Sequence, residues 1–539
     1  MPDPARFDII LAMGEPHRKS HHSNTARIVG FWAGIIAFAL TLVFGSLDSE
    51  HTEVSRMAAV ALLMAIWWIT DAIPLAATAL LPLLLYPTLG IMTGKETAPV
   101  YFNYIIFLFI GGFLIALAME RWNLHRRIAL MIIGLFGSRP SQLVLGFMIA
   151  TAFLSMWISN TATSIMMLAI SLAVIKQAED AFGAGKTRNL SLALLLGVAY
   201  SASIGGLATL VGTPPNLALV RIFALSFPGA EAAGSEIAFG QWMLFGVPLM
   251  LIMLATTWLI LTRLLFRSGD ELTLDPETIR KERDQLGPMS CEEKMVAVIF
   301  AATALLWIFR KKLEVGSVVI PGWSDALPFG KYIDDGTIAI GMAIVLFCIP
   351  SRRREEGDEE NSHRTLLDTG VFAKLPWHII LLFGGGFALA SGFKNSGLSE
   401  WIGQHFAGME GAPEWLLVGA VTGGITFLTE LTSNTATTEM ILPILASIAS
   451  AAKIHPLVLM VPAALAASCA FMMPVATPPN AIVFASGRIR IADMAKAGFI
   501  INLISIIVVT AIFLLLGPAV FQIDPDTLPD WARASAASP

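Results

Sequence analysis

The chain has 539 residues, of which 55% are apolar and only 14% are charged, whereas a typical soluble chain carries about 25% charged residues. Its net charge of −5 offers no basic surface for nucleic acid, and its three cysteines form no cluster for a disulfide framework or a metal. These numbers exclude soluble enzymes, secreted disulfide scaffolds and nucleic-acid binders. The fold class that remains is an all-α polytopic membrane protein.

In chain order, the sequence opens with a polar stretch and continues with long windows almost free of charge. Residues 1–27 are polar and show no cleavable signal, so we expect a cytoplasmic N-terminal segment. A hydrocarbon core of about 30 Å requires about 20 apolar residues in a helix. On this basis the predicted spans are 28–47, 57–75, 76–90, 100–119, 190–225, 240–266, 292–309, 334–350, 376–395, 456–489 and 494–520.

Two further apolar stretches, 141–180 and 413–452, are each interrupted near the middle by a short polar tripeptide. Counted as re-entrant helical hairpins, they leave about eleven transmembrane helices. With the N-terminus inside, this arrangement places nearly all Lys and Arg of the short loops on the cytoplasmic side, as expected. The exception is the run Arg310, Lys311 and Lys312, which falls outside. We predict a multi-pass protein of the plasma (inner) membrane with a cytoplasmic N-terminus.

The chain also contains an internal repeat. Three motifs recur in the same order, with offsets of 274 (433 − 159), 274 (383 − 109) and 264 (477 − 213) residues: SNTAT at 159–163 and 433–437, FxGGF at 109–113 and 383–387, and TPPN at 213–216 and 477–480. Three ordered matches are not a chance event, so the chain consists of two related halves.

The predicted organisation follows from the repeat. After the N-terminal segment and the first span, it comprises repeat 1 at 57–266 with a hairpin at 141–180 and a broken helix at 190–225, a cytoplasmic linker at 267–290, repeat 2 at 291–520 with a hairpin at 413–452 and a broken helix at 456–489, and a polar tail at 521–539. Because one hairpin enters from inside and the other from outside, the repeats have inverted topology. Inverted repeats with broken helices are typical of secondary transporters, which bind substrate near the midplane.

Four helix breaks define the candidate site: the two Ser-Asn-Thr tips and the two Thr-Pro-Pro-Asn loops. Paired prolines remove amide donors and prevent the preceding residues from staying helical. Unwound backbone at membrane depth is tolerated only where it is buried in protein or lines a wet cavity. The breaks carry no Lys, Arg or His. Free helix N-termini suit an anion, and unwound carbonyls suit a cation such as Na⁺. The predicted cargo is a small dianion bound with neutralising Na⁺ ions.

With these paired motifs, the sequence resembles the divalent anion/sodium symporter family, the di- and tricarboxylate transporters of the INDY type. The matching repeats cover roughly 57–520. A single Ser-Asn-Thr carries no weight, since Ser23-Asn24-Thr25 occurs in the polar N-terminus. The resemblance implies a homodimer in the lipid bilayer in which each protomer works by an elevator mechanism. The early spans of each half would form a scaffold, and the hairpins and last spans would carry the substrate.

The resemblance also implies residue roles. The first Na⁺ site takes Ser155, Ser159 and Asn160 with the backbone around Gly212, and the second takes Thr429, Thr432 and Asn434 with the backbone around Ala476. The substrate carboxylates would be contacted by Asn160, Thr161, Asn434 and Thr435, joined by Thr213 or Pro214 and Thr477 or Pro478. Ala476 departs from its counterpart Gly212; a carbonyl ligand survives this change, with a narrower choice of backbone conformation.

The leading prediction is Na⁺-coupled symport of C4-dicarboxylates such as succinate, malate and fumarate. A Na⁺-independent dicarboxylate exchanger and a sulfate or citrate carrier of the same fold remain open, because the motifs recognise carboxylate-like groups whatever joins them. The sequence shows no nucleophile–base pair and no metal cluster, so we expect neither an enzyme nor an organic cofactor. Glu430, beside the second tip, either couples protons or, as we expect, is a buried structural carboxylate.

Overall fold

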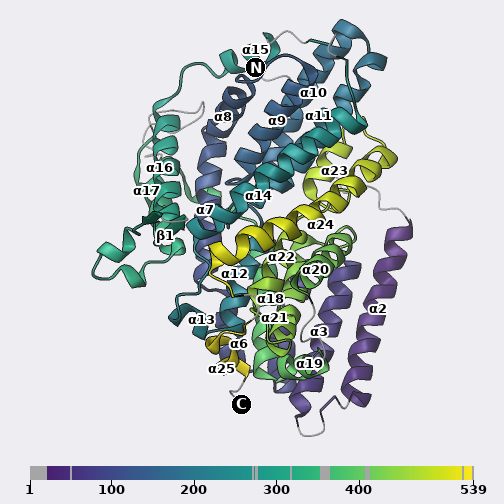
Figure 1. The fold of residues 1–539 in the computed structure, drawn as a ribbon, viewed down its shortest axis with the longest axis vertical. Helices are drawn as coiled ribbons and strands as arrows, with labels where there is room; N and C mark the ends of the chain where they lie inside the picture. Colours follow the sequence, from purple (N-terminus) through teal and green to yellow (C-terminus); the bar gives the residue numbers. More distant parts are fainter. Residues whose placement is uncertain are drawn as a thin grey trace.

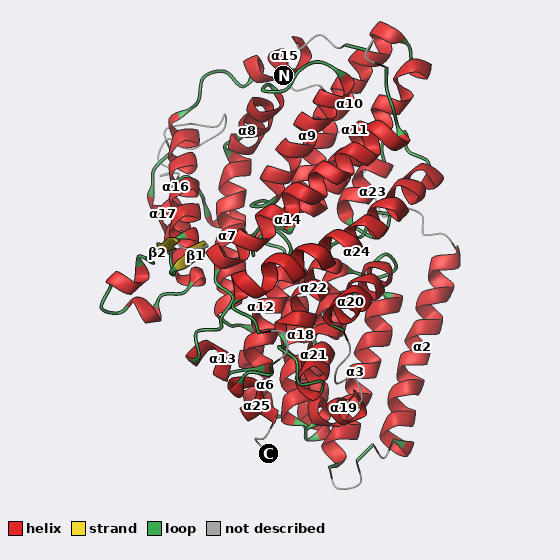
Figure 2. Cartoon of the chain, in the orientation of Figure 1, coloured by secondary structure: helices red, strands yellow, loops and turns green. Residues whose placement is uncertain are grey.

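The computed structural model describes residues 21–45, 47–48, 51–269, 272–273, 277–315, 318–351, 365–406, 413–524 and 527–536. Most of the expected cytoplasmic segment 1–27 and the last residues of the expected tail therefore lie outside the described residues. Within the described part the chain is almost entirely helical, apart from one short antiparallel strand pair (Figure 2). The all-α prediction is confirmed.

The first half contains two hairpin-forming helices and one broken helix among longer spans. Its elements are α2 (His21–Phe44), α3 (Thr52–Thr70), α4 (Leu75–Thr78), α5 (Leu81–Leu89), α6 (Gly94–Tyr101), α7 (Tyr104–Arg121), α8 (Leu124–Ile133), α9 (Pro140–Ser155), α10 (Asn160–Phe182), α11 (Ala184–Gly206), α12 (Pro214–Ser226), α13 (Gly229–Ala232), α14 (Phe239–Leu259) and the π-helix η1 (Ile260–Leu265).

The second half follows the same plan after a linker helix. Its elements are α15 (Glu277–Gln285), α16 (Cys291–Ile308), β1 (Leu313–Val315), β2 (Val318–Ile320), the 3-10 turns η2 (Ser324–Ala326) and η3 (Gly330–Tyr332), α17 (Asp335–Cys348), η4 (Thr369–Lys374), α18 (Trp377–Asn395), α19 (Leu398–Phe406), α20 (Glu414–Thr429), α21 (Asn434–Ala451), α22 (Leu457–Ala466), α23 (Pro478–Phe484), α24 (Ile491–Phe521) and α25 (Asp530–Ala536).

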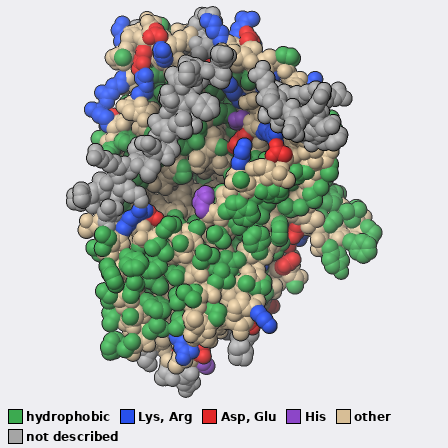
Figure 3. All heavy atoms as spheres, turned by 180° about the vertical axis from the view of Figure 1, so that it is seen from behind, with side chains coloured by type: hydrophobic (Ala, Val, Ile, Leu, Met, Phe, Trp, Pro, Cys, Tyr) green, Lys and Arg blue, Asp and Glu red, His purple; other side chains and the backbone are tan. Residues whose placement is uncertain are grey.

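The helices have the length and hydropathy of a membrane protein. In the described part of the chain, 8 helices are long and apolar enough to cross a membrane, and shorter apolar helices lie beside them. Helix α2 packs on α3 at one side of the molecule (Figure 1). A broad band of hydrophobic side chains covers much of one face, with Lys and Arg gathered toward one end (Figure 3). Eleven crossings remain a prediction, because the broken helices divide several spans into short pieces.

The two halves interlock through their broken helices. Helix α11 packs on α9 and α10, and α12 packs on α18 and on α21 of the other half. Reciprocally, α23 of the second half packs on α10 and α11 of the first. Because the second arm of each broken helix lies against the hairpin of the opposite half, the four predicted breaks are brought toward one another.

The three cations that violate the expected charge distribution are paired with acids. Arg310 is buried and places Nε 2.5 Å from Asp335 Oδ1, while Lys311 forms an ion pair with Glu236. Lys312 lies 2.7 Å from Glu314, and the hydrogen bond from Lys312 holds the pKa of Glu314 below its usual value. This run stays an exception to the expected distribution of Lys and Arg, and the orientation of the chain stays a prediction.

Candidate functional site

One cavity of about 730 Å³ lies where the two halves meet. Its walls include both hairpin tips and both Thr-Pro-Pro-Asn loops. All eight residues predicted to contact substrate line it, namely Asn160, Thr161, Thr213, Pro214, Asn434, Thr435, Thr477 and Pro478. Of the remaining residues predicted at the cation sites, the structure places four in the wall, Ser159, Gly212, Thr432 and Ala476, and two directly behind it, Ser155 and Thr429.

The first hairpin breaks for a local reason. Ser159 is the N-cap of α10, and its hydroxyl accepts a hydrogen bond from the Ala162 amide at 3.2 Å. An N-cap serine satisfies one of the amides that a helix start leaves free. The fully buried Ser155 hydroxyl donates to Asn160 Oδ1 at 2.5 Å. This bond turns the Asn160 side chain back toward α9, so two predicted cation ligands share one contact.

The second hairpin repeats this arrangement with a threonine in place of the serine. The Thr429 hydroxyl lies 2.7 Å from Asn434 Oδ1 and 3.0 Å from the Ala467 carbonyl oxygen. The Thr432 hydroxyl is 2.5 Å from the hydroxyl of Thr437, on the first turn of α21. The two tips therefore hold their asparagines in the same way, as expected for related halves.

The unwound loops are shaped by a second asparagine pair that carried no role in the sequence-based assignment. Asn216 Nδ2 donates to the carbonyl oxygens of Gly206 at 3.1 Å and Thr209 at 2.8 Å. Asn480 Nδ2 donates to the carbonyl oxygens of Ala470 at 3.2 Å and Met473 at 3.1 Å. These acceptors correspond to Gly206 and Thr209 by the repeat offset of 264 residues (470 − 206, 473 − 209). The last residue of each TPPN motif thus closes the loop that the prolines open.

A close backbone approach leaves no room for a side chain at Gly212, in the unwound loop of the first half. A Cβ on Gly212 would lie 2.6 Å from the Gly206 carbonyl oxygen, closer than any side chain allows. On the other side of this contact, a Cβ on Gly206 would lie 3.0 Å from the Gly212 carbonyl oxygen and 3.1 Å from Asn160 Oδ1. Two predicted ligands of the first Na⁺ site therefore converge beside Gly206.

The second half accommodates Ala476 because its broken helix ends earlier. Helix α22 stops at Ala466, which corresponds to position 202, whereas α11 continues to Gly206 (466 − 264 = 202). The longer unwound segment leaves room for a side chain and also frees more backbone amides. Glu430 accepts three of them, from Phe471 at 2.7 Å, Met472 at 2.9 Å and Met473 at 3.0 Å.

The Glu430 carboxylate accepts a fourth hydrogen bond, from Asn502 Nδ2 of α24 at 2.8 Å, and the residue is almost fully buried. In all four contacts the carboxylate is the acceptor, three of them at Oε1 and one at Oε2. Glu430 does not line the cavity within the described residues. These contacts favour the structural carboxylate over a proton-coupling group.

The cavity reaches from the hairpin tips to the end of α3 in the first half and the start of α18 in the second half. It extends to Asp71, which ends α3 in a left-handed conformation and pairs with Arg27, and to His378 in the first turn of α18. These are the only ionisable side chains among the described residues that line it. Hydroxyls, carboxamides, carbonyls and the starts of α10, α12, α21 and α23 make up the remaining polar surface, which can hold an anion and cations together.

Comparison with known proteins agrees with this geometry. A family model described as the sodium:sulfate symporter transmembrane region matches residues 25–523. The chain belongs to the sodium:sulfate symporter family. It is 44% identical over 507 residues, 93% of each chain, to the sodium-dependent dicarboxylate transporter SdcS of Staphylococcus saprophyticus. It is also 44% identical over 516 residues, 94% of each chain, to SdcS of Staphylococcus aureus strain MRSA252.

Two solved structures share the fold of this symporter-family chain at low identity. MtrF of Neisseria gonorrhoeae aligns with a TM-score of 0.52 and 14% identity, covering 86% of this chain and 94% of MtrF. The YdaH transporter of Alcanivorax borkumensis aligns with a TM-score of 0.51 and 14% identity, covering 92% and 99%. The family assignment confirms the resemblance and identifies the chain as a multi-pass membrane transporter, not an enzyme.

Proposed function

We propose that this symporter-family protein couples the inward movement of Na⁺ to uptake of C4-dicarboxylates such as succinate, malate and fumarate. The observation that carries the proposal is the meeting of both Ser-Asn-Thr tips and both Thr-Pro-Pro-Asn loops at one cavity without lysine or arginine among its described lining. The 44% identical relatives named sodium-dependent dicarboxylate transporters support the choice of cargo. We place the protein in the plasma (inner) membrane with its N-terminus in the cytoplasm.

In this proposal each half contacts one end of the dianion. Asn160 and Thr161 start α10, and Asn434 and Thr435 start α21, so their side chains and the adjacent free amides face the same cavity. The positive end of a helix dipole and unpaired N–H groups favour a carboxylate. Thr213 with Pro214 and Thr477 with Pro478 complete the two ends.

Sodium supplies the positive charge that the described lining lacks. The first ion would be bound by Ser155, Ser159, Asn160 and the Gly212 carbonyl, and the second by their counterparts Thr429, Thr432, Asn434 and the Ala476 carbonyl. Oxygen ligands of this kind suit a hard cation. Two ions neutralise a dianion, and any further ion makes transport electrogenic.

An elevator movement fits the way the helices are tied together. The ion pair Arg488–Glu179, at 2.5 Å, joins α10 of the first hairpin to the segment between α23 and α24. The pair Arg188–Asp493, at 3.3 Å, joins α11 to the first turn of α24. These elements surround the tips and would move as one carrier. Helices α3–α7 and α16–α18 would form the scaffold and the contact between two protomers of a homodimer.

Uptake into proteoliposomes tests the function directly. Purified protein is reconstituted, and labelled succinate uptake is measured with an inward Na⁺ gradient and with K⁺ replacing Na⁺. We expect uptake only with Na⁺, competed by malate and fumarate but not by sulfate or citrate. Uptake in K⁺ that requires internal succinate would establish an exchanger instead, and competition by sulfate or citrate alone would reassign the cargo.

Matched asparagine variants test the site. We expect Asn160→Ala and Asn434→Ala each to abolish uptake without loss of folded dimer, as judged by size-exclusion chromatography. Asn24→Ala in the N-terminal copy of the tripeptide is the control and should transport normally. Full uptake by either tip variant would disprove the site assignment, even if the wild-type protein proved to be a Na⁺–dicarboxylate symporter.

A further inference from the structure

Two smaller cavities lie at corresponding places in the two halves. Each lies where a short helix meets the hairpin that follows it in the chain. In the first half this is α8 beside α9 and α10, and in the second half it is α19 beside α21. The two short helices are related by the repeat, since Leu124 and Leu398 differ by 274 residues (398 − 124). Each junction borders a hairpin that we assign to the proposed carrier, so a ligand bound there would contact the carrier.

The first-half junction has an apolar floor and a basic rim. Its cavity of about 230 Å³ is lined by α8, the turn after it, α9, α10 and the linker helix α15. The floor consists of Leu130, Ile133, Phe136, Leu143, Val174 and Ile279. Arg280 and Arg283 of α15 form the rim, and no acidic side chain lines this cavity within the described residues.

The linker helix is held in place by its other side chains, which leaves the two rim arginines available. Glu282 of α15 pairs with Arg126 of α8, and Ile279 packs into the hydrophobic core. Arg283 has one distant, exposed contact, 4.0 Å from Asp284, and the structure shows no ion pair for Arg280 among the described residues. Exposed pairs of this kind contribute little, so both guanidinium groups can bind an anion.

The surface beside this cavity is suited to lipid. Met131, in the same α8 helix that contributes Leu130 and Ile133 to the floor, is 57% exposed, and Leu135, in the turn after α8, is 83% exposed. Exposed apolar side chains next to arginines are typical of a helix lying at the membrane interface. Basic pockets between membrane helices on the cytoplasmic side bind the head groups of anionic lipids.

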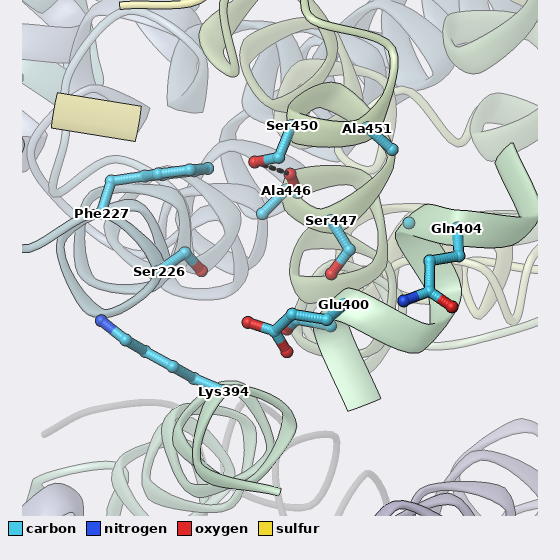
Figure 4. Close-up of a pocket in the computed structure, with 11 residues that line it drawn as sticks. Ser226, Phe227, Lys394, Glu400, Gln404, Ala446, Ser447, Ser450 and Ala451 are labelled. Atoms are coloured by element: carbon cyan, nitrogen blue, oxygen red, sulfur yellow. Dashed lines mark hydrogen bonds between the residues drawn. The ribbon is translucent and has the colours of Figure 1, made fainter. Parts of the chain in front are cut away.

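The second-half junction differs in charge and serves as an internal comparison. Its cavity of about 370 Å³ is lined by Lys394 and by Glu400, which lie on facing sides with Ser447 and Gln404 nearby (Figure 4). The opposite charges of Lys394 and Glu400 cancel within this small cavity, and its remaining polar lining is uncharged. This cavity therefore lacks the excess positive charge of its counterpart.

We propose that the cavity between α8, the first hairpin and α15 binds the phosphate group of an anionic lipid through Arg280 and Arg283. The lipid's acyl chains would lie along Met131 and Leu135, and its head group would join the linker helix α15 to the first hairpin. The inference rests on the membrane placement of α8 and is independent of which dianion is transported. A soluble phosphate ester could supply the same group, and the experiment separates the two sources.

Lipid retention on the purified full chain tests the proposal. Delipidated protein is titrated with phosphatidylglycerol or phosphatidylcholine, and bound lipids are counted by native mass spectrometry. We expect the double variant Arg280→Gln with Arg283→Gln to bind phosphatidylglycerol about 25-fold more weakly at one site, since each cation near an anionic head group contributes about a factor of five. Phosphatidylcholine binding should be the same for both proteins.

Two controls complete the test. Lys394→Gln, in the repeat-related cavity, should leave phosphatidylglycerol binding unchanged. Free glycerol 3-phosphate should not compete at concentrations comparable to the lipid, and competition at those concentrations would identify a soluble phosphate ester as the ligand of the same arginines. Both arginines are exposed, so their replacement should leave the protein folded, and thermal denaturation verifies this. Equal phosphatidylglycerol binding by wild-type protein and the double variant would overturn the proposal.

Discussion

Replacing Glu430 tests whether this carboxylate anchors the unwound loop of the second half. It accepts three backbone amides and the Asn502 carboxamide at distances between 2.7 and 3.0 Å in a buried setting. A buried donor left without an acceptor costs about 1–3 kcal/mol. Glu430→Ala leaves four such donors, about 4–12 kcal/mol in total, which is comparable with the whole stability of a typical folded domain. We expect this variant not to yield folded protein.

Glu430→Gln is the informative change, because it keeps the shape and one acceptor oxygen. The amide oxygen can still accept from Phe471, Met472 and Asn502, while the new NH₂ group faces the Met473 amide, which loses its acceptor. The cost of that one lost bond is about 1–3 kcal/mol. The loop leads directly to Ala476, so we expect weaker Na⁺ binding, with the Na⁺ concentration for half-maximal uptake raised about 5- to 150-fold if the whole cost falls on binding.

The assay is succinate uptake into proteoliposomes as a function of Na⁺ concentration, repeated with and without a pH gradient. The control is Met156→Leu at the corresponding position of the first half (430 − 274 = 156), a volume-conserving change that costs less than about 1.5 kcal/mol. Wild-type Na⁺ dependence in Glu430→Gln would refute the anchoring role. Loss of a response to the pH gradient in this variant would instead support proton coupling.

Three further outcomes follow from particular contacts. Gly212→Ala should lower uptake at least about tenfold, because its Cβ would lie 2.6 Å from the Gly206 carbonyl oxygen. Relieving this contact requires a backbone shift, and a tenfold loss corresponds to a cost of about 1.4 kcal/mol. The control Ala476→Gly should transport, and equal uptake by both variants would contradict the steric argument. Asn216→Asp and Asn480→Asp should each destroy uptake, since each places a carboxylate against two carbonyl oxygens, and normal uptake by either would show that the loop does not need this bond. Arg310→Ala should lower the free energy of unfolding by about 3–5 kcal/mol, as expected when one partner of a buried ion pair is removed. Adding Asp335→Ala should restore part of the lost thermal stability, because it removes the unpaired carboxylate. A double variant as unstable as Arg310→Ala alone would show that the pair does not contribute to stability.

The architecture was predictable because membrane spans and internal repeats leave strong marks in sequence. Long uncharged windows predicted the helices, and the recurrence of Ser-Asn-Thr predicted the breaks now seen between Ser155 and Asn160 and between Thr429 and Asn434. A tripeptide of capping residues inside an apolar segment has few outcomes other than a helix end followed by a helix start. The recurrence of the same motifs at the repeat offset then predicted the residues that the second half contributes to the site.

The contacts across the site were not predictable in the same way. Hydropathy places the charged run at Arg310 in an outside loop, but only the fold brings Asp335 close enough to pair with it. Likewise Asn502 lies 72 residues beyond Glu430 in a featureless apolar helix, and nothing in the local sequence indicates their hydrogen bond. Asn216 and Asn480 did carry a signal, since both belong to the repeated TPPN motif, but their partners are backbone carbonyls that no sequence pattern identifies.

The difference between the halves gives the two proposed cation sites unequal surroundings. In the first half, α11 continues to Gly206 and its last turn crowds the loop, so position 212 has no room for a side chain. In the second half the helix stops four residues earlier, and the freed amides are held by Glu430 instead of by helical bonds. The loop at the second proposed site is thus held by a carboxylate from a different element, while the loop at the first is held by close backbone packing. A substitution that loosens Glu430 should therefore weaken one Na⁺ site selectively and leave the other intact.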